Sequence, residues 1–306
     1  MYGIIANKTF RLTSLKSSND KKELYYRPDQ FIIDFLTLCD RIDDEEFKEW
    51  FFLLKDVLLE KKEQFFKECK VKSIPYAFCL SEKRDNLTHW DRYAAGCTGV
   101  CIGFNVAALD IHIRRSGAEV FGKYLYDINN VLYQQEKIED HIKRSILRLM
   151  NVFGARQDEE SLKASIKMSG YVTLAAVYLQ AAAFVKHGAF FDEDEIRLFH
   201  DATSINVALR LIESIKPDID IETYKYVNEN FLDVVSDFRL NEEFYMTKSG
   251  IRSYRNLCLE KIWGPGTITE IILGPMCVQN KEELKRFLKA NGLAGTKISI
   301  SKVPIR

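Results

Sequence analysis

The stretch KHGAFFDEDEIRL, residues 186–198, holds four acids together with a lysine, a histidine and an arginine. It follows a predicted long helix, and its pattern from Phe191 onward predicts a strand, in which successive side chains point to opposite faces. In that register Glu193, Glu195 and Arg197 share one face with Phe191. Neighbouring carboxylates raise each other's pKa and an arginine lowers it, so this face is typical of an acid–base or cation-binding surface. The alternative interpretation is a solvated acidic turn before an edge strand.

Length and composition favour a folded protein with a large core. The chain has 306 residues, of which 46% are hydrophobic, and this allows one large domain or two smaller ones. Its 44 basic residues balance 44 acidic ones. Such a balance argues against a broad basic surface that binds nucleic acid, although it is compatible with a local basic patch.

Cysteine spacing and hydropathy predict a cytoplasmic protein. The seven cysteines include no C-x-x-C pair, and Cys97 and Cys101 have no histidine or second cysteine pair nearby. We therefore expect reduced thiols and no bound metal. Residues 1–10 do not resemble a signal peptide. The longest apolar run, residues 172–185, is shorter than the ~20 residues of a membrane span, so we expect a buried helix and no membrane partner.

Periodicity on both sides of the acidic stretch predicts more helices than strands. Helices are expected from Pro28 and at 47–66, 85–95, 105–115, 134–153, 161–186, 206–215 and 281–290. Strands are expected at 9–15, 72–81, 99–104, 121–126, 191–198, 244–247, 251–259, 268–273 and 297–301. Since they do not alternate regularly, we predict an α+β fold, a helix-rich single domain (1–306) around a mixed, mostly antiparallel sheet. A helical subdomain is expected at about 29–70 and 134–187.

Polar constellations are the remaining signals for function, because the sequence has no P-loop, HExxH or GxSxG motif. Gly99 and Gly103 lie inside one predicted strand, which excludes a dinucleotide fingerprint. The constellations comprise an acidic turn, the end of a strand and a short helix after it: Asn19, Asp20, Glu23, Ser81, His89, Trp90 and Tyr93. The alternatives are a surface or capping role for the histidine and packing for the two aromatic residues.

The run AFCLSEKRDNLTHWDRYAAGCTGVCIGF, residues 77–104, resembles a widespread bacterial family, number twenty-nine seventy-one of the domain-of-unknown-function series. Four further segments are similar to it in the expected order: 19–23, 186–197, 271–275 and 301–306. The chain departs from the family pattern before Arg11, where members usually have an additional strand and helix that could shape the site. The resemblance implies a cytosolic effector with a role in stress or antiviral defence, without implying a mechanism.

A second resemblance is to ADP-ribosyltransferases, which share an early strand with a basic residue, a strand ending in serine, and Glu-x-Glu. It implies that Arg11 binds the NAD phosphates through its planar fork and that Ser81 orients the neighbouring elements. Glu195 would stabilise an oxocarbenium-like transition state at the nicotinamide ribose, with Glu193 beside the acceptor. The implied activity is that of a transferase with NAD as substrate and a protein or nucleic-acid acceptor.

Three hypotheses for function follow. The leading one is an enzyme that acts on NAD or a related nucleotide by ADP-ribosyl transfer or N-glycosidic cleavage, with Ser81, Glu193 and Glu195 catalytic. Its expected substrate-binding residues are Arg11, Asn19, Asp20, Glu23, His89, Trp90, Tyr93, Lys186 and Arg197. The second is a nucleotide sensor without turnover. The third is a magnesium-dependent hydrolase or nuclease, in which Asp20 and Glu23 join the two glutamates as oxygen ligands.

Overall fold

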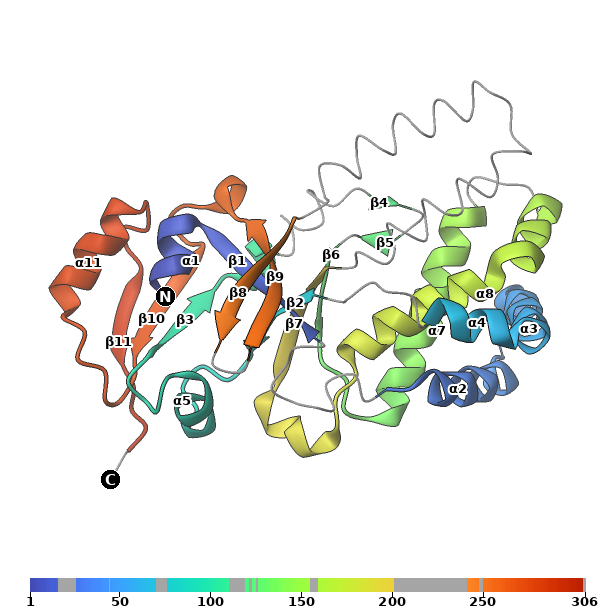
Figure 1. Cartoon of the computed structure of the whole chain (residues 1–306), viewed down its shortest axis with the longest axis horizontal. Helices are drawn as coiled ribbons and strands as arrows, with labels where there is room; N and C mark the ends of the chain where they lie inside the picture. Colours follow the sequence, from blue (N-terminus) through green and yellow to red (C-terminus); the bar gives the residue numbers. More distant parts are fainter. Residues whose placement is uncertain are drawn as a thin grey trace, which may run out of the picture.

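The computed structural model describes residues 1–15, 26–43, 45–69, 76–109, 119–120, 123–124, 126–154, 159–200, 241–247 and 250–304. Within these ranges the fold is α+β, as predicted. A six-stranded sheet lies between a bundle of helices on one side and a smaller three-stranded sheet with its own helices on the other (Figure 1). A two-stranded ribbon, β4 (Glu119–Val120) with β5 (Lys123–Tyr124), completes the described strands.

The six-stranded sheet is antiparallel at every described pairing. In spatial order its strands are β6 (Tyr126–Asn130), β7 (Glu195–His200), β2 (Tyr76–Ser81), β1 (Thr9–Ser14), β9 (Gly250–Cys258) and β8 (Glu242–Thr247). The register of β1 with β2 covers only Thr13↔Ala77 and Ser14↔Tyr76, whereas β1 pairs with β9 along most of its length. The two halves of the sheet therefore share few registered residues.

The helical bundle covers the end of the sheet that carries Ala77 and Phe199 and forms the largest apolar core. Its helices are α2 (Pro28–Arg41), α3 (Glu45–Glu60), α4 (Lys62–Cys69), α7 (Gln135–Gly154) and α8 (Glu159–Phe184). The predicted burial of α8 is confirmed, since its residues 174–183 are buried except for the partly buried Leu179. Small side chains permit this packing: a Cβ atom at Gly170 would lie 3.2 Å from a Leu54 methyl.

The three-stranded sheet combines an early strand with the C-terminal part of the chain. It consists of β11 (Lys297–Ile300), β10 (Ile268–Leu273) and β3 (Val100–Phe104), with β10 and β11 parallel and β10 and β3 antiparallel. Helices α1 (Tyr2–Asn7) and α11 (Lys281–Ala290) share its apolar core. The Asn280 side chain caps α11 by accepting hydrogen bonds from the amides of Glu282 and Glu283. Helix α5 (Leu87–Tyr93) and the short helix η3 (Glu260–Ile262) lie in the connections.

Several expected element boundaries are wrong. Residues 188–193 form the 3₁₀ helix η2 (Gly188–Glu193), and the strand β7 begins only at Glu195, because Asp194 takes a left-handed conformation that ends η2. The helix expected through 66 is interrupted at Lys61, whose ammonium bonds the carbonyls of Lys167 and Met168.

The described residues of the strand expected at 121–126 do lie in strands, in β5 and at the start of β6, but β6 continues beyond the predicted end to Asn130. Helix α1 was not predicted at all. The helix expected at 206–215 lies outside the described residues, as does the end of the one begun at Asn105, whose side chain accepts a bond from the amide of Ala108.

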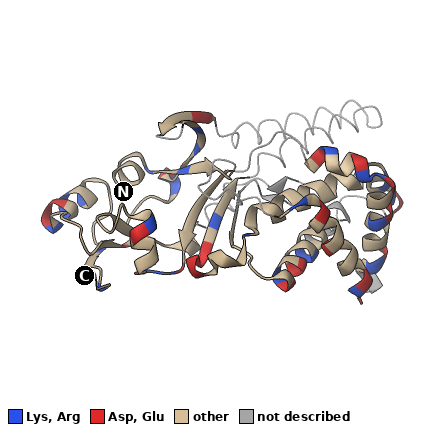
Figure 2. Ribbon diagram, turned by 60° about the horizontal axis from the view of Figure 1, so that its bottom comes forward, with Lys and Arg blue, Asp and Glu red and all other residues tan. Residues whose placement is uncertain are grey.

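Charged residues of both signs alternate with other residues along the described helices (Figure 2). None of the described helices is both long enough and apolar enough to cross a membrane. The division into one domain with a helical subdomain stays a prediction.

A candidate site in a buried charged cluster

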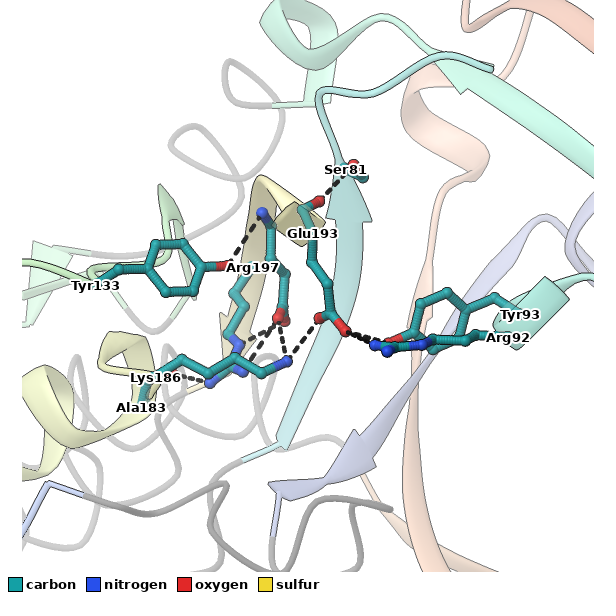
Figure 3. A network of polar contacts seen from close by, with 9 residues as sticks. Ser81, Arg92, Tyr93, Tyr133, Ala183, Lys186, Glu193 and Arg197 are labelled. Atoms are coloured by element: carbon teal, nitrogen blue, oxygen red, sulfur yellow. Dashed lines mark hydrogen bonds and ion pairs between the residues drawn. The ribbon is translucent and has the colours of Figure 1, made fainter. Parts of the chain in front are cut away.

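Six predicted site residues form a cluster where α8 ends and β7 begins (Figure 3). We call it the charged cluster, and its members are Ser81, Tyr93, Lys186, Glu193, Glu195 and Arg197. The local chain explains the grouping. His187 caps η2 by accepting from the amide of Ala189, and Asp194 (φ 41°) then reverses the chain into β7. Glu193 and Glu195 therefore converge even though only Glu195 lies in a strand.

Lys186 joins the two glutamates. Its Nζ lies 2.8 Å from Glu193 Oε2 and 2.9 Å from Glu195 Oε2. All three side chains are buried. A buried ammonium is tolerated only when it is paired with opposite charge and hydrogen-bonded, and here two carboxylates supply both.

Arg197 is completely buried and holds Glu195 from its other side. Its Nε donates to Glu195 Oε1 at 2.7 Å, and one terminal nitrogen lies 3.3 Å from Oε2. The other terminal nitrogen donates to the carbonyl oxygen of Ala183 at 2.6 Å, near the end of α8. Glu195 and Arg197 lie two residues apart on β7 and so share a face of the sheet, as the sequence predicted.

Burial of Glu195 alone would raise the pKa of its carboxyl. The charge and hydrogen bonds of Arg197, the charge of Lys186 and a hydrogen bond from the Cys79 thiol outweigh that effect and lower this pKa to about 2. The carboxylate is therefore ionised at every pH near neutrality. Both of its oxygens accept hydrogen bonds from cations, so Glu195 holds the Lys186 and Arg197 side chains in place.

Glu193 connects the buried cluster to exposed side chains of α5. The Tyr93 hydroxyl donates to Glu193 Oε1 at 2.8 Å, and Arg92 lies 3.5 Å from the same oxygen. Burial, followed by the bond to Glu193, raises the pKa of Tyr93, so the phenol stays protonated and donates. The Ser81 hydroxyl donates to the Glu193 carbonyl at 2.7 Å and fixes its backbone.

Of the remaining predicted site residues, Trp90 and Arg11 lie away from the charged cluster, whereas His89 borders it at Tyr93. Trp90 is buried against Cys97 and Ile272, and its indole nitrogen donates to Asp85. The side chain of Arg11 is stacked over Tyr254, 4.4 Å from the ring centre, on β9. His89 lies next to Tyr93 with ring centres 5.8 Å apart, and burial lowers its pKa. Asn19, Asp20 and Glu23 lie outside the described residues.

Sequence reasoning missed several neighbours of the cluster. Arg92 and Lys83 are partly exposed cations beside Glu193 and Asp194. Tyr133 lies after β6, and its hydroxyl accepts from the Glu195 amide at 3.5 Å. Arg92 directly precedes Tyr93 in the family-like run, which could have drawn attention to it. Nothing in the local pattern marks Tyr133, because its proximity depends on the β6–β7 pairing.

A metal site needs several ligating side chains close together, and this requirement is not met in the described part of the chain. There, no three His, Cys, Asp or Glu side chains group together as a metal site would require. Glu193 and Glu195 face each other across the Lys186 ammonium, which already occupies the position that a cation bridging them would take. A metal bound by these two glutamates would have to displace that ammonium.

Comparison with known proteins identifies one family. Residues 89–198 match the model of a family described as a protein of unknown function, DUF2971. The family resemblance is confirmed over these residues. The DUF2971 region contains every member of the charged cluster except Ser81. No curated protein and no solved structure matches the chain.

Proposed function

We propose that the protein acts on NAD or a related nucleotide at the bond between the base and the ribose. The observation that carries the proposal is the position of Glu193. Its carboxylate is fixed from inside by the buried Lys186 and bonded from outside by Tyr93, whose side chain is 65% exposed. It is thus the member of the charged cluster that links the buried cations to the surface.

The chemistry of N-glycosidic cleavage suits a fixed carboxylate. As the bond to the base breaks, positive charge develops on the ribose, and a preorganised anion stabilises that charge without reorganising. Lys186 and Tyr93 hold the Glu193 carboxylate in one orientation. We assign Glu193 this stabilising role, with either water or a macromolecule as the acceptor of the ribosyl group.

Glu195 has a different role in this proposal from the one that the sequence suggested. Both of its oxygens are engaged by buried cations, and its low pKa keeps it anionic. We infer that it positions Lys186, which in turn positions Glu193. Loss of Glu195 would therefore act on turnover through the geometry of Glu193.

The phosphates of a nucleotide would bind to the cations at the rim of the cluster. Arg92 and Lys83 both approach its outer side, and their side chains are partly exposed. Arg92 lies 3.5 Å from the Glu193 carboxylate and Lys83 lies 3.4 Å from the Asp194 carboxylate, so both ion pairs are loose, although the Lys83 ammonium also donates to the Asp192 carbonyl at 2.5 Å. An arginine fork matches two phosphate oxygens. Partly solvated cations lose little interaction free energy when they exchange one anion for another.

The test is NAD consumption by the parent, Glu193→Gln and Glu270→Gln, each with and without EDTA. Glu270 is the matched control, because it is also paired with cations and its pKa is also lowered to about 2, but it lies on β10 in the other sheet. Removing one preorganised electrostatic contact costs ~10²–10³ in rate, and we expect that loss for Glu193→Gln and little change for Glu270→Gln.

Three results would redirect the proposal. Full activity of a folded Glu193→Gln protein would remove this residue from the chemistry. Activity abolished by EDTA would favour the magnesium-dependent hydrolase or nuclease. No consumption by the parent, with NAD binding seen by calorimetry, would favour the sensor, for which the closed and fully paired network around Lys186 is the supporting observation.

A further inference from the structure

The hairpin formed by β8 and β9 exposes three large apolar side chains on one face. Phe244, Met246 and Ile251 are 64%, 74% and 68% exposed. They share a face because Phe244 and Met246 are two residues apart on β8, and Met246 is registered opposite Ile251 on β9. Contiguous exposed apolar residues of this size mark interaction surfaces in folded proteins.

The same face of the sheet is apolar core further along. Leu257 of β9 and Phe10 of β1 are registered opposite each other on it and are buried. The alternation that buries Leu257 therefore continues into the hairpin, where no residue of the described ranges buries Phe244, Met246 or Ile251. β8 is also the last strand of the sheet among the strands described, and an edge strand presents backbone groups that can pair with another strand.

We propose that β8 pairs antiparallel with β8 of a second copy of this chain, about a two-fold axis at Tyr245. This register places Phe244 opposite Met246 of the other copy and Glu243 opposite Thr247. Both apolar residues then lie on the same face, next to Ile251. Two-fold pairing is the commonest arrangement of identical subunits, and strand addition at a sheet edge is a common way for chains to associate.

Charge selects this register over its neighbours. An axis at Glu243 would put the two Glu243 side chains directly opposite each other, and like charges opposed across a strand pair are destabilising. An axis at Phe244 would place the Glu242 carboxylate opposite the apolar Met246 side chain. The carboxylate would then have no cation opposite it, and Met246 would have no apolar side chain opposite it. Of these three axes, only the one at Tyr245 keeps the acids apart and pairs each Phe244 with a Met246.

The contact is short, so the association should be weak. Pairing over residues 243–247 buries less than the ~800 Å² per partner of a standard interface. We expect a dimer that forms with rising concentration, with a dissociation constant on the order of 10–100 µM. This inference does not depend on the proposed activity.

Sedimentation velocity from about 5 to 500 µM tests the proposal. The parent should shift from monomer to dimer. Met246→Lys, which places a charge opposite Phe244, should stay monomeric throughout. The control Val278→Lys adds the same charge at a fully exposed apolar residue after β10 and should dimerise like the parent. A parent that stays monomeric, or a dimer that survives Met246→Lys, overturns the proposal.

A crosslinking experiment tests the register and does not require Met246→Lys to fold. Under mild oxidation Tyr245→Cys should form a disulfide-linked dimer, because directly opposed Cβ atoms lie within disulfide range. Thr247→Cys should crosslink no more than the parent, whose Cys79 and Cys258 are also exposed and set the background. Equal crosslinking of the two variants would contradict the axis at Tyr245.

Discussion

Glu195 and Glu270 are both carboxylates with a pKa lowered to about 2, but they reach this value by different physical routes. Burial by itself would raise the pKa of Glu195, but the buried cations Arg197 and Lys186 outweigh this effect and lower it. For Glu270 the largest cause is the hydrogen bond from Arg84, whose Nε and one terminal nitrogen donate to its two oxygens at 2.6 Å. Arg84 is 60% exposed, whereas Arg197 is completely buried.

Equal pKa values in these two carboxylates therefore do not mean equal structural consequences when a partner is lost. If Arg84 is lost, Glu270 keeps Lys297 and Ser299 as partners, and water can take the place of the guanidinium, which is 60% exposed. If Arg197 is lost, the Glu195 charge stays in a low-dielectric environment without one of its two cations. The charged cluster should therefore be far more sensitive to substitution than the Arg84–Glu270 pair.

The largest expected effect is that of Arg197→Met. Removing one partner of a buried ion pair costs about 3–5 kcal/mol, and this variant also leaves the Ala183 carbonyl without its donor. Urea unfolding of the variant and of the matched Arg84→Met protein measures the contrast. Equal losses of unfolding free energy in the two variants would contradict the expected difference between the buried cluster and the Arg84–Glu270 pair.

The second prediction concerns acid. The pKa of Glu195 is about 2 in the folded protein against 4.5 in the unfolded chain, so folding gains stability above pH 4.5 that is lost as the pH falls towards 2. The full contribution is about 3 kcal/mol. Urea unfolding of the parent between pH 6 and pH 3 should show this loss, and Glu195→Gln should flatten the curve. If the unfolding free energy of Glu195→Gln depends on pH as steeply as that of the parent, groups other than Glu195 dominate the sensitivity to acid.

The third prediction concerns the helix that supports Arg197. Ala182 is buried in α8 beside the residue whose carbonyl Arg197 bonds. Ala182→Leu would overpack the bundle at a cost of about 1–3 kcal/mol. The exposed Met168→Leu change on the same helix serves as control in thermal melts. If Ala182→Leu melts like the parent, the bundle does not constrain this end of α8.

The smallest effect is that of salt. Exposed charges are screened at high ionic strength and buried ones much less. We expect the small stability difference between parent and Arg84→Met to vanish in about 1 M salt, while the difference for Arg197→Met persists. Melts at low and high salt measure both differences. A salt-sensitive Arg197→Met difference would mean that water reaches the cluster.

Local signals in the sequence predicted most of the described elements. Pro28 begins α2, and the apolar spacing of 161–186 matches α8 to within two residues at each end. The run 268–273 forms β10 within its predicted bounds. These elements depend on periodicity and on capping residues that act over a few positions, so the local sequence is enough to predict them.

The candidate site was predictable in part. The sequence marked the cluster's glutamates, Lys186, Arg197, Ser81 and Tyr93, but it assigned the glutamates to one continuous strand. It could not show the left-handed turn at Asp194, or that Trp90 packs against Cys97 and Ile272 and Arg11 against Tyr254, away from the cluster. It also gave no sign of Tyr133.

Residue types, their spacing and their charge determined that residues 186–198 carry paired acids and cations next to a long apolar helix. The tertiary structure decided which of these charges are buried and which pairs they form. Lys186 meets Glu193 and Glu195 because η2 folds back, and Arg197 is buried because the end of α8 lies over β7. Burial and pairing depend on contacts between residues distant in the chain, and such contacts leave no local pattern in a single sequence.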